Sequence, residues 1–386
     1  MGGRLNFNER QNADRAMEPL VLWQHKWSAD LFVPGYLFFG GLSGGLVIIA
    51  ALADLVGLWQ PRLLPLARRA GLAALVCLGI AGLLLTTHLG KPERGLGFPL
   101  FFTNYESWMT RGGWVVGAAG PLVAAYAAFW WFGVLPRLRR VVGLVAIPLA
   151  GLLAMYTGFL LSGAGYVPLW SRAHLPLLFL SSALTTGTAA AGLLSVLALW
   201  VARPERRDPA FVRRVLGVAL VVLIALELYE LRQYVTYLAA RAPDKALAQA
   251  EPTGDFVAPM GTRLAYVYLT GGPGYPWRLM DAGPGAVEVG TRTRPTLAPW
   301  FWVGVVGVGL VLPLVLTVLE FLAEAVSRAL ATGLALAKFT LVLVGGFLLR
   351  VVLVWGGDLK APLPFPPQLW PLGGPGALPP IPGVGG

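Results

Sequence analysis

Apolar residues occur along the chain in long runs that are almost free of charge, separated by short clusters rich in Gly, Pro and Arg. A helix of about 20 apolar residues is long enough to cross the hydrocarbon core of a bilayer. Eight such runs predict eight transmembrane helices, at about residues 31–57, 70–88, 112–134, 141–163, 175–202, 212–240, 297–325 and 333–356. The pattern therefore predicts an all-α integral membrane protein.

The composition supports this fold class. Of the 386 residues 56% are hydrophobic and only 13% are charged, which is about half the charged share of an ordinary soluble domain. This balance excludes a soluble globular enzyme. The net charge of +11 comes from short Arg clusters between the apolar runs, so it indicates membrane topology rather than a nucleic-acid surface.

The distribution of Lys and Arg predicts the orientation of the chain. Thirteen of them lie in or near the connections after spans one, three, five and seven, with Arg213, Arg214 and Lys338 counted among them, and four follow spans two and four: Lys91, Arg94, Arg111 and Arg172. Basic residues stay on the cytoplasmic side, so we expect a protein of the cytoplasmic (inner) membrane with both termini outside. Five regions follow: an outer N-terminal segment (1–30), spans one to six (31–240), an outer polar loop (241–298), spans seven and eight (299–356) and an outer Pro/Gly-rich tail (357–386). The loop is either a plain connector or a docking site for a partner subunit.

The residues that could hold a redox centre are few. The chain has one cysteine, Cys77, and three histidines, His25, His88 and His174. An iron–sulfur cluster needs about four thiolates, and two haems of the membrane cytochrome type need about four axial ligands. The sequence also lacks nucleotide-binding loops and zinc motifs of the HExxH kind. We therefore expect no haem, no iron–sulfur cluster and no other metal in this chain, and any redox role would use metal centres of another chain.

Three segments, read in order, carry a family resemblance. The first is GYLFFGGLSGG (35–45), whose small residues let a neighbouring helix approach closely. The second is HLGKPERG (88–95) with NYESWMTRGGW (104–114). The third covers residues 156–187, beginning with YTGFLLSGAGYVPLW and ending with TTG. Together they resemble the NrfD/PsrC family, the membrane subunits of polysulfide reductase and related respiratory oxidoreductases. The resemblance covers about residues 27–240.

This resemblance implies an eight-helix anchor of two four-helix bundles that binds a quinone, either menaquinone or ubiquinone. Electrons would pass between the quinone and an iron–sulfur subunit on the outer face, and from there to or from a molybdopterin-type catalytic subunit. The chain would then be the quinone-reactive subunit of an oxidoreductase, not a catalyst alone, with or without coupled proton translocation. Two positions depart from the family: His88 stands where an acidic residue is common, and Tyr36 stands where the polysulfide reductase subunit has a histidine.

Four residues are candidates for the quinone site: Tyr36, His88, Tyr156 and Trp170. Quinone chemistry moves two electrons and two protons, so the site needs hydrogen-bond donors for the ring carbonyls and an apolar slot. Tyr156 corresponds by motif to a quinone-contacting tyrosine of the family, and His88 could relay protons. The alternatives are an interfacial aromatic belt for Tyr36, Tyr156 and Trp170, and a solvated loop for His88.

Ionisable residues inside the spans are candidates for a proton path. Four polar residues of the sixth span share one helical stripe: Glu227, Glu230, Tyr234 and Tyr237. Charged groups within a membrane are costly and mark ion or proton routes, although an ion pair with Arg232 or Arg350 would also explain the glutamates. Asp54, near the inner end of the first span, either reaches the headgroups or forms the inner mouth of such a route.

Two other classes of protein remain open. In a transporter, Glu227 and Asp54 would bind an ion during alternating access, but transporters usually show internal repeats with broken helices in matching positions. No clear repeat is visible in this sequence. The other class is a structural anchor without quinone chemistry.

Overall fold

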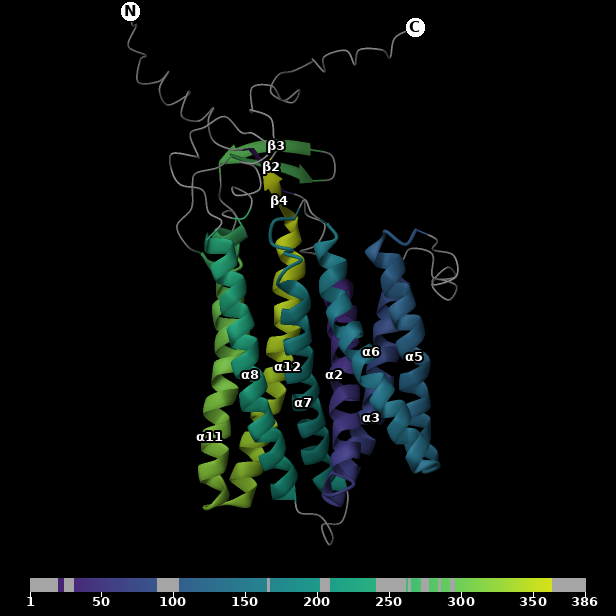
Figure 1. The fold of residues 1–386 in the computed structure, drawn as a ribbon. Helices are drawn as coiled ribbons and strands as arrows, with labels where there is room; N and C mark the ends of the chain where they lie inside the picture. Colours follow the sequence, from purple (N-terminus) through teal and green to yellow (C-terminus); the bar gives the residue numbers. More distant parts are fainter. Residues whose placement is uncertain are drawn as a thin grey trace, which may run out of the picture.

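Long helices run side by side and a small sheet lies at one end of them (Figure 1). The computed structural model describes residues 20–23, 31–88, 104–164, 167–201, 209–240, 262, 265–271, 278–283, 286–291 and 296–362. We call the end with the sheet the sheet end and the other the opposite end.

The helices follow the apolar runs of the sequence. Their bounds are α2 (Phe32–Val56), η1 (Pro61–Leu63) leading into α3 (Leu64–His88), α5 (Trp108–Phe132), α6 (Pro136–Ser162), α7 (Leu175–Val201), α8 (Pro209–Ala240), the π-helix η3 (Trp300–Val311) leading into α11 (Leu312–Glu324), and α12 (Arg328–Trp355). Backbone groups in a bilayer must be hydrogen-bonded within the protein, which favours helices for such runs. The predicted all-α membrane fold is confirmed.

Among the described residues, seven helices are long and apolar enough to cross a membrane. The sixth predicted span, α8, is not one of these seven, although at 32 residues it is the longest of the described helices. This helix contains five charged residues, which make it more polar than the other spans: Arg213, Arg214, Glu227, Glu230 and Arg232. The eighth crossing therefore stays a prediction.

The second span begins earlier than the sequence predicted. We expected it to start near residue 70, after Arg68 and Arg69, but the helix starts at Leu64 and a 3₁₀ turn precedes it. Arg68 lies on the surface of the bundle. A long basic side chain at the end of a span can reach the headgroup region, so it does not have to end the helix.

The helix contacts fall into two sets that share a boundary. In the first set α2 packs on α3 and α6, and α5 packs on α3 and α6; in the second set α7 packs on α8 and α12, and α11 packs on α12 and α8. The two sets meet mainly where α2 packs against α7. The arrangement as two four-helix bundles, which the family resemblance implied, stays a prediction.

Glycines bring α2 close to two neighbouring helices, as the small residues of the first motif predicted. A Cβ atom at Gly45 would lie 1.9 Å from the carbonyl oxygen of Ala183 on α7, and one at Gly44 would lie 2.7 Å from that of Ala150 on α6. Both distances are too short for any side chain. The backbone of α2 therefore touches that of α6 within the first set and that of α7 at the boundary of the two sets.

A four-stranded sheet, with order β3-β2-β1-β4, forms the sheet end. The strands are β1 (Leu20–Trp23), β2 (Arg278–Gly283), β3 (Ala286–Thr291) and β4 (Leu359–Pro362). β1 pairs in parallel with β2, and the β2–β3 and β1–β4 pairs are antiparallel. From the sequence we expected only polar segments here. Most of regions 1–30, 241–298 and 357–386 lies outside the described residues.

Some basic residues that we counted as topology signals are buried. Near the opposite end, Arg213 of α8 lies 3.3 Å from a carboxylate oxygen of Glu320, and Lys338 of α12 pairs with the same carboxylate. Both basic side chains are at most 6% exposed. These ion pairs link α8, α11 and α12, so Arg213 and Lys338 contribute to packing and not only to orientation.

Candidate functional site

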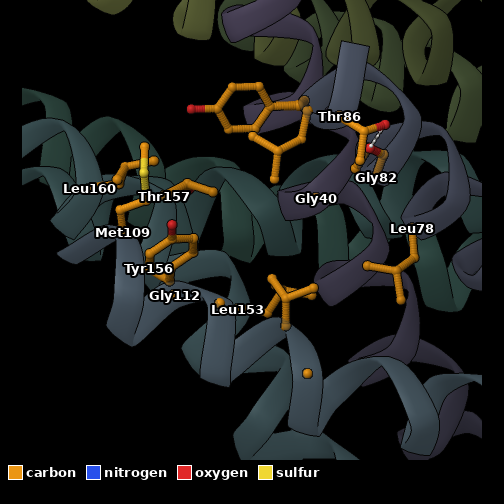
Figure 2. A pocket seen from close by; sticks show the side chains of 16 residues that line it. Gly40, Leu78, Gly82, Thr86, Met109, Gly112, Leu153, Tyr156, Thr157 and Leu160 are labelled. Carbon is orange, nitrogen blue, oxygen red and sulfur yellow. Dashed lines mark hydrogen bonds between the residues drawn. The ribbon is translucent and has the colours of Figure 1, made fainter. Parts of the chain in front are cut away.

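A cavity of about 330 Å³ lies between α2, α3, α5 and α6, in the half of these helices nearer the sheet end. Its lining is mostly glycine, leucine and other apolar residues, and Figure 2 shows side chains of several helices pointing into one space. Four lining residues carry a hydroxyl group: Tyr36, Thr86, Tyr156 and Thr157. Small-molecule sites have this character, an apolar cleft with a few polar groups.

The hydroxyl of Tyr156 differs from those of the two threonines. Thr86 donates to the carbonyl oxygen of Gly82 at 3.0 Å, and Thr157 donates to that of Ala154 at 2.8 Å. No hydrogen bond joins the Tyr156 hydroxyl to the described part of the chain. It is therefore the phenolic donor that a ligand in the cavity could use.

The structure brings two of the four predicted quinone residues together. Tyr36 from α2 and Tyr156 from α6 both line the cavity. His88 is the last residue of α3, on the molecular surface and two residues beyond the lining residue Thr86. The rest of the HLGKPERG motif, residues 89–95, lies outside the described residues.

Trp170 does not line the cavity. It is 4% exposed, and its indole Nε1 donates to the carbonyl oxygen of Leu353 on α12 at 2.7 Å. This contact ties the connection between α6 and α7 to the second set of helices. Trp170 is thus buried between helices, away from the cavity, and its place in the quinone site stays a prediction.

The part of the cavity that α5 supplies was not predicted from the sequence. Met109 and Gly112 of the NYESWMTRGGW motif line the cavity, while Arg111 between them points elsewhere, donating from Nε to the carbonyl oxygen of Tyr105 at 2.7 Å. The guanidinium of Arg111 lies 4.9 Å from the ring centre of Trp108. The adjacent glycines of the motif were the available signal, since glycine is favoured where another group approaches the backbone closely.

A second polar site lies on the other side of α2. Glu227 and Arg350 are 2% and 1% exposed, and Ser182 of α7 lies between them. Arg350 donates from Nη1 to the Ser182 hydroxyl at 2.6 Å, and the Glu227 carboxyl lies near the hydroxyls of Ser182 and Thr185. The sequence suggested Arg350 as a partner for Glu230, whereas the structure places Arg350 near Glu227.

Consecutive residues of α2 face the two sites. Gly40 lines the cavity, while a Cβ atom at Gly41 would lie 3.4 Å from Nη2 of Arg350. The single helix α2 therefore separates the cavity from the buried charges. Glu230 lies further along α8, half-buried and one turn closer to the sheet end than Glu227.

Asp54 lies at the far end of α2 from the cavity. Its carboxylate accepts hydrogen bonds from Nε and Nη2 of Arg139 on α6 at 2.7 and 2.8 Å, and Arg140 lies 3.5 Å away. Asp54 is 1% exposed, and the Arg139 guanidinium stacks 3.4 Å from the ring centre of Trp130. Asp54 therefore points into the protein, and its contacts favour a structural role.

No group of three or more His, Cys, Asp or Glu residues is arranged to hold a metal ion within the described ranges. Cys77, half-buried on α3, forms no disulfide.

Fold and site together define a multi-pass helical membrane protein with an apolar, tyrosine-bearing cavity and a separate buried polar site at Glu227 and Arg350. The structure resembles that of bd oxidase from Geobacillus thermodenitrificans, with a TM-score of 0.52 and 10% sequence identity over 85% of this chain and 84% of that one. At this identity the likeness concerns the fold alone.

Sequence comparisons identify the family. The family described as "Polysulphide reductase, NrfD" matches residues 21–361. The C subunit of polysulfide reductase from Wolinella succinogenes is 26% identical over 84% of this chain and 92% of that protein, and protein NrfD of Escherichia coli is 26% identical over 84% and 93%. The chain therefore belongs to the polysulphide reductase NrfD family, whose members are membrane subunits of respiratory oxidoreductases. This result confirms the resemblance noted in the sequence.

Proposed function

We propose that this protein is the quinone-reactive membrane subunit of a respiratory oxidoreductase and that the cavity between α2, α3, α5 and α6 holds the quinone ring. The observation that carries the proposal is Tyr156, which lines an apolar cavity and whose hydroxyl donates no hydrogen bond to the described part of the chain. The volume of about 330 Å³ lies within the range of small-molecule sites.

In this proposal Tyr156 donates a hydrogen bond to one quinone carbonyl. Tyr36 lines the same cavity from α2 and is the second tyrosine able to contact the ring. His88, two residues beyond Thr86 at the end of α3, passes protons between the cavity and the surface. The apolar leucine and glycine lining accommodates the ring and the start of its isoprenoid tail.

Electrons pass between the quinone and an iron–sulfur subunit that docks at the sheet end, and from there to or from a molybdopterin-type catalytic subunit. Family membership supports this kind of partner. The position of the cavity, in the half of the first helix set nearer the sheet end, would keep the distance between quinone and docked subunit short. We place the sheet end and both termini on the outer side of the cytoplasmic membrane. Basic residues, which stay on the cytoplasmic side, concentrate in the connections of the opposite end.

Quinone chemistry also moves protons, and we propose Glu227 as a proton-carrying group, with Glu230 one turn further along the same helix. Glu227 is buried beside Ser182, which also accepts a hydrogen bond from Arg350. Ionisable groups kept inside a membrane protein are by default functional. Along α2, Gly40 lines the cavity and the next residue, Gly41, faces Arg350 of the buried polar site.

The test is Tyr156→Phe in the intact complex, because it removes one hydroxyl and keeps the ring. Loss of a hydrogen bond in a desolvated site costs about 1–3 kcal/mol, so turnover at limiting quinone should fall roughly 5- to 150-fold. The matched control is Tyr229→Phe, which removes a hydroxyl from the surface of α8. Turnover equal to wild type in Tyr156→Phe would assign this residue to the interfacial belt and contradict the proposed site.

A further inference from the structure

The phenol ring of Tyr156 lies directly against the backbone of α5 at Gly112. A Cβ atom at Gly112 would lie 1.7 Å from Cζ, 1.8 Å from Cε2 and 2.1 Å from the hydroxyl oxygen of Tyr156. Figure 2 shows the two residues next to each other at the edge of the cavity. The distal half of the ring therefore occupies the volume that any side chain at position 112 would need.

Nearby contacts hold α5 and α6 at this spacing. One turn before Gly112, Trp108 stacks on Phe159 of α6 with ring centres 4.7 Å apart and planes at 7°. A Cβ atom at Gly163, also close to this stack, would lie 3.1 Å from Trp108. Since the stack lies one turn from the Tyr156–Gly112 contact on both helices, α5 cannot move away at residue 112 without breaking it.

We propose that Gly112 is a positioning residue for the quinone site: its missing side chain provides the slot that holds the Tyr156 phenol against α5 with the hydroxyl at the cavity. This inference rests on the proposed function and adds a lining residue that acts through Tyr156. With a methyl group at position 112, the ring must turn out of the slot, and the cavity is the open space beside it. The phenol then occupies part of the quinone volume and its hydroxyl leaves the bonding position.

The experiment is a double-mutant cycle in the intact complex, with turnover at limiting quinone as the readout. Gly112→Ala should lower turnover at limiting quinone about 5- to 150-fold, which is the range for a lost hydrogen bond. The loss should appear as a raised KM for quinone. In the Tyr156→Ala background the same Gly112→Ala change should have no further effect, because no ring is left to displace. The control is Gly120→Ala on the same helix, where a Cβ atom meets nothing within 4 Å.

Assembly supplies a second readout if Gly112→Ala alone does not fold. The double variant Gly112→Ala with Tyr156→Ala should then restore assembly with the partner subunits, since the clash involves this pair of residues. An equal loss from Gly112→Ala in both backgrounds, or no rescue of assembly, would show a general packing role and overturn the inference. If Tyr156→Phe and Tyr156→Ala leave quinone turnover at the wild-type value, the proposed function itself fails. If the two Tyr156 variants lower quinone turnover while Gly112→Ala does not, only the positioning role of Gly112 fails.

Discussion

The ion pair between Asp54 and Arg139 allows a direct test of whether a buried acid in this protein is structural or part of a proton route. Asp54→Asn keeps the shape of the side chain and removes its charge. Arg139, which donates two hydrogen bonds of 2.7 and 2.8 Å to Asp54, would then stay buried at 6% exposure without a counter-charge. Arg140, 3.5 Å from the same carboxylate, adds to the uncompensated positive charge.

The size of the effect follows from this geometry. Breaking a buried ion pair by removing one partner costs about 3–5 kcal/mol, whereas an exposed pair contributes about 0–1 kcal/mol. Asp54 is 1% exposed and both hydrogen bonds are short, so the larger range applies. Asp54→Asn should therefore lower the free energy of unfolding by about 3–5 kcal/mol.

The assay is equilibrium unfolding of the purified protein in mixed detergent micelles, together with quinone turnover per assembled complex. Glu106→Gln, which changes an exposed carboxylate near the start of α5 to an amide, is the matched control. We expect a large loss of stability for Asp54→Asn with turnover per assembled complex unchanged. A variant as stable as wild type that has lost proton coupling would refute the structural role and restore Asp54 as the inner mouth of a proton route.

Three further predictions concern the proton path, the topology and the metal content. Glu227→Gln should slow turnover or abolish proton coupling while quinone still binds, because the group lies across α2 from the cavity; loss of assembly alone would make Glu227 a structural partner of Arg350. A topology reporter fused after Gly386 should be active outside the cytoplasm, since basic residues concentrate in the connections of the opposite end; a cytoplasmic signal would contradict the orientation. The purified chain should show no haem absorbance and no stoichiometric iron, since it has one cysteine and three histidines; metal in the isolated subunit would contradict this expectation.

The sequence predicted the helices well because the bilayer imposes a length on apolar runs. The first span was expected at about 31–57 and is observed at Phe32–Val56, and the fifth at about 175–202 is observed at Leu175–Val201. The errors occur where charge was read as the end of a span, as at Arg68 and Arg69. Hydropathy does not reveal whether a basic side chain reaches the headgroups or finds a buried acid, as Lys338 does with Glu320.

The candidate site was predicted only in part, and the reason is helix register. Tyr36 was chosen for its position near one membrane face and Tyr156 also for its place in the family motif, and both line the cavity. The slot at Gly112 depends on the rotation of α5 relative to α6, which the Trp108–Phe159 stack defines and which no single span encodes. The same limit applies to Trp170, because an interfacial tryptophan and a buried anchor have the same sequence signal.

Photo-crosslinking with an azido-quinone tests the central claim most directly. The purified complex is labelled with and without excess native quinone, and the labelled peptides are mapped. With the quinone ring at Tyr156, we predict labelling that native quinone suppresses in the stretches of α5 and α6 that line the cavity, 109–117 and 153–160. Suppressible labelling elsewhere, for example on α8 or α12, or none at all, would contradict a quinone site at Tyr156.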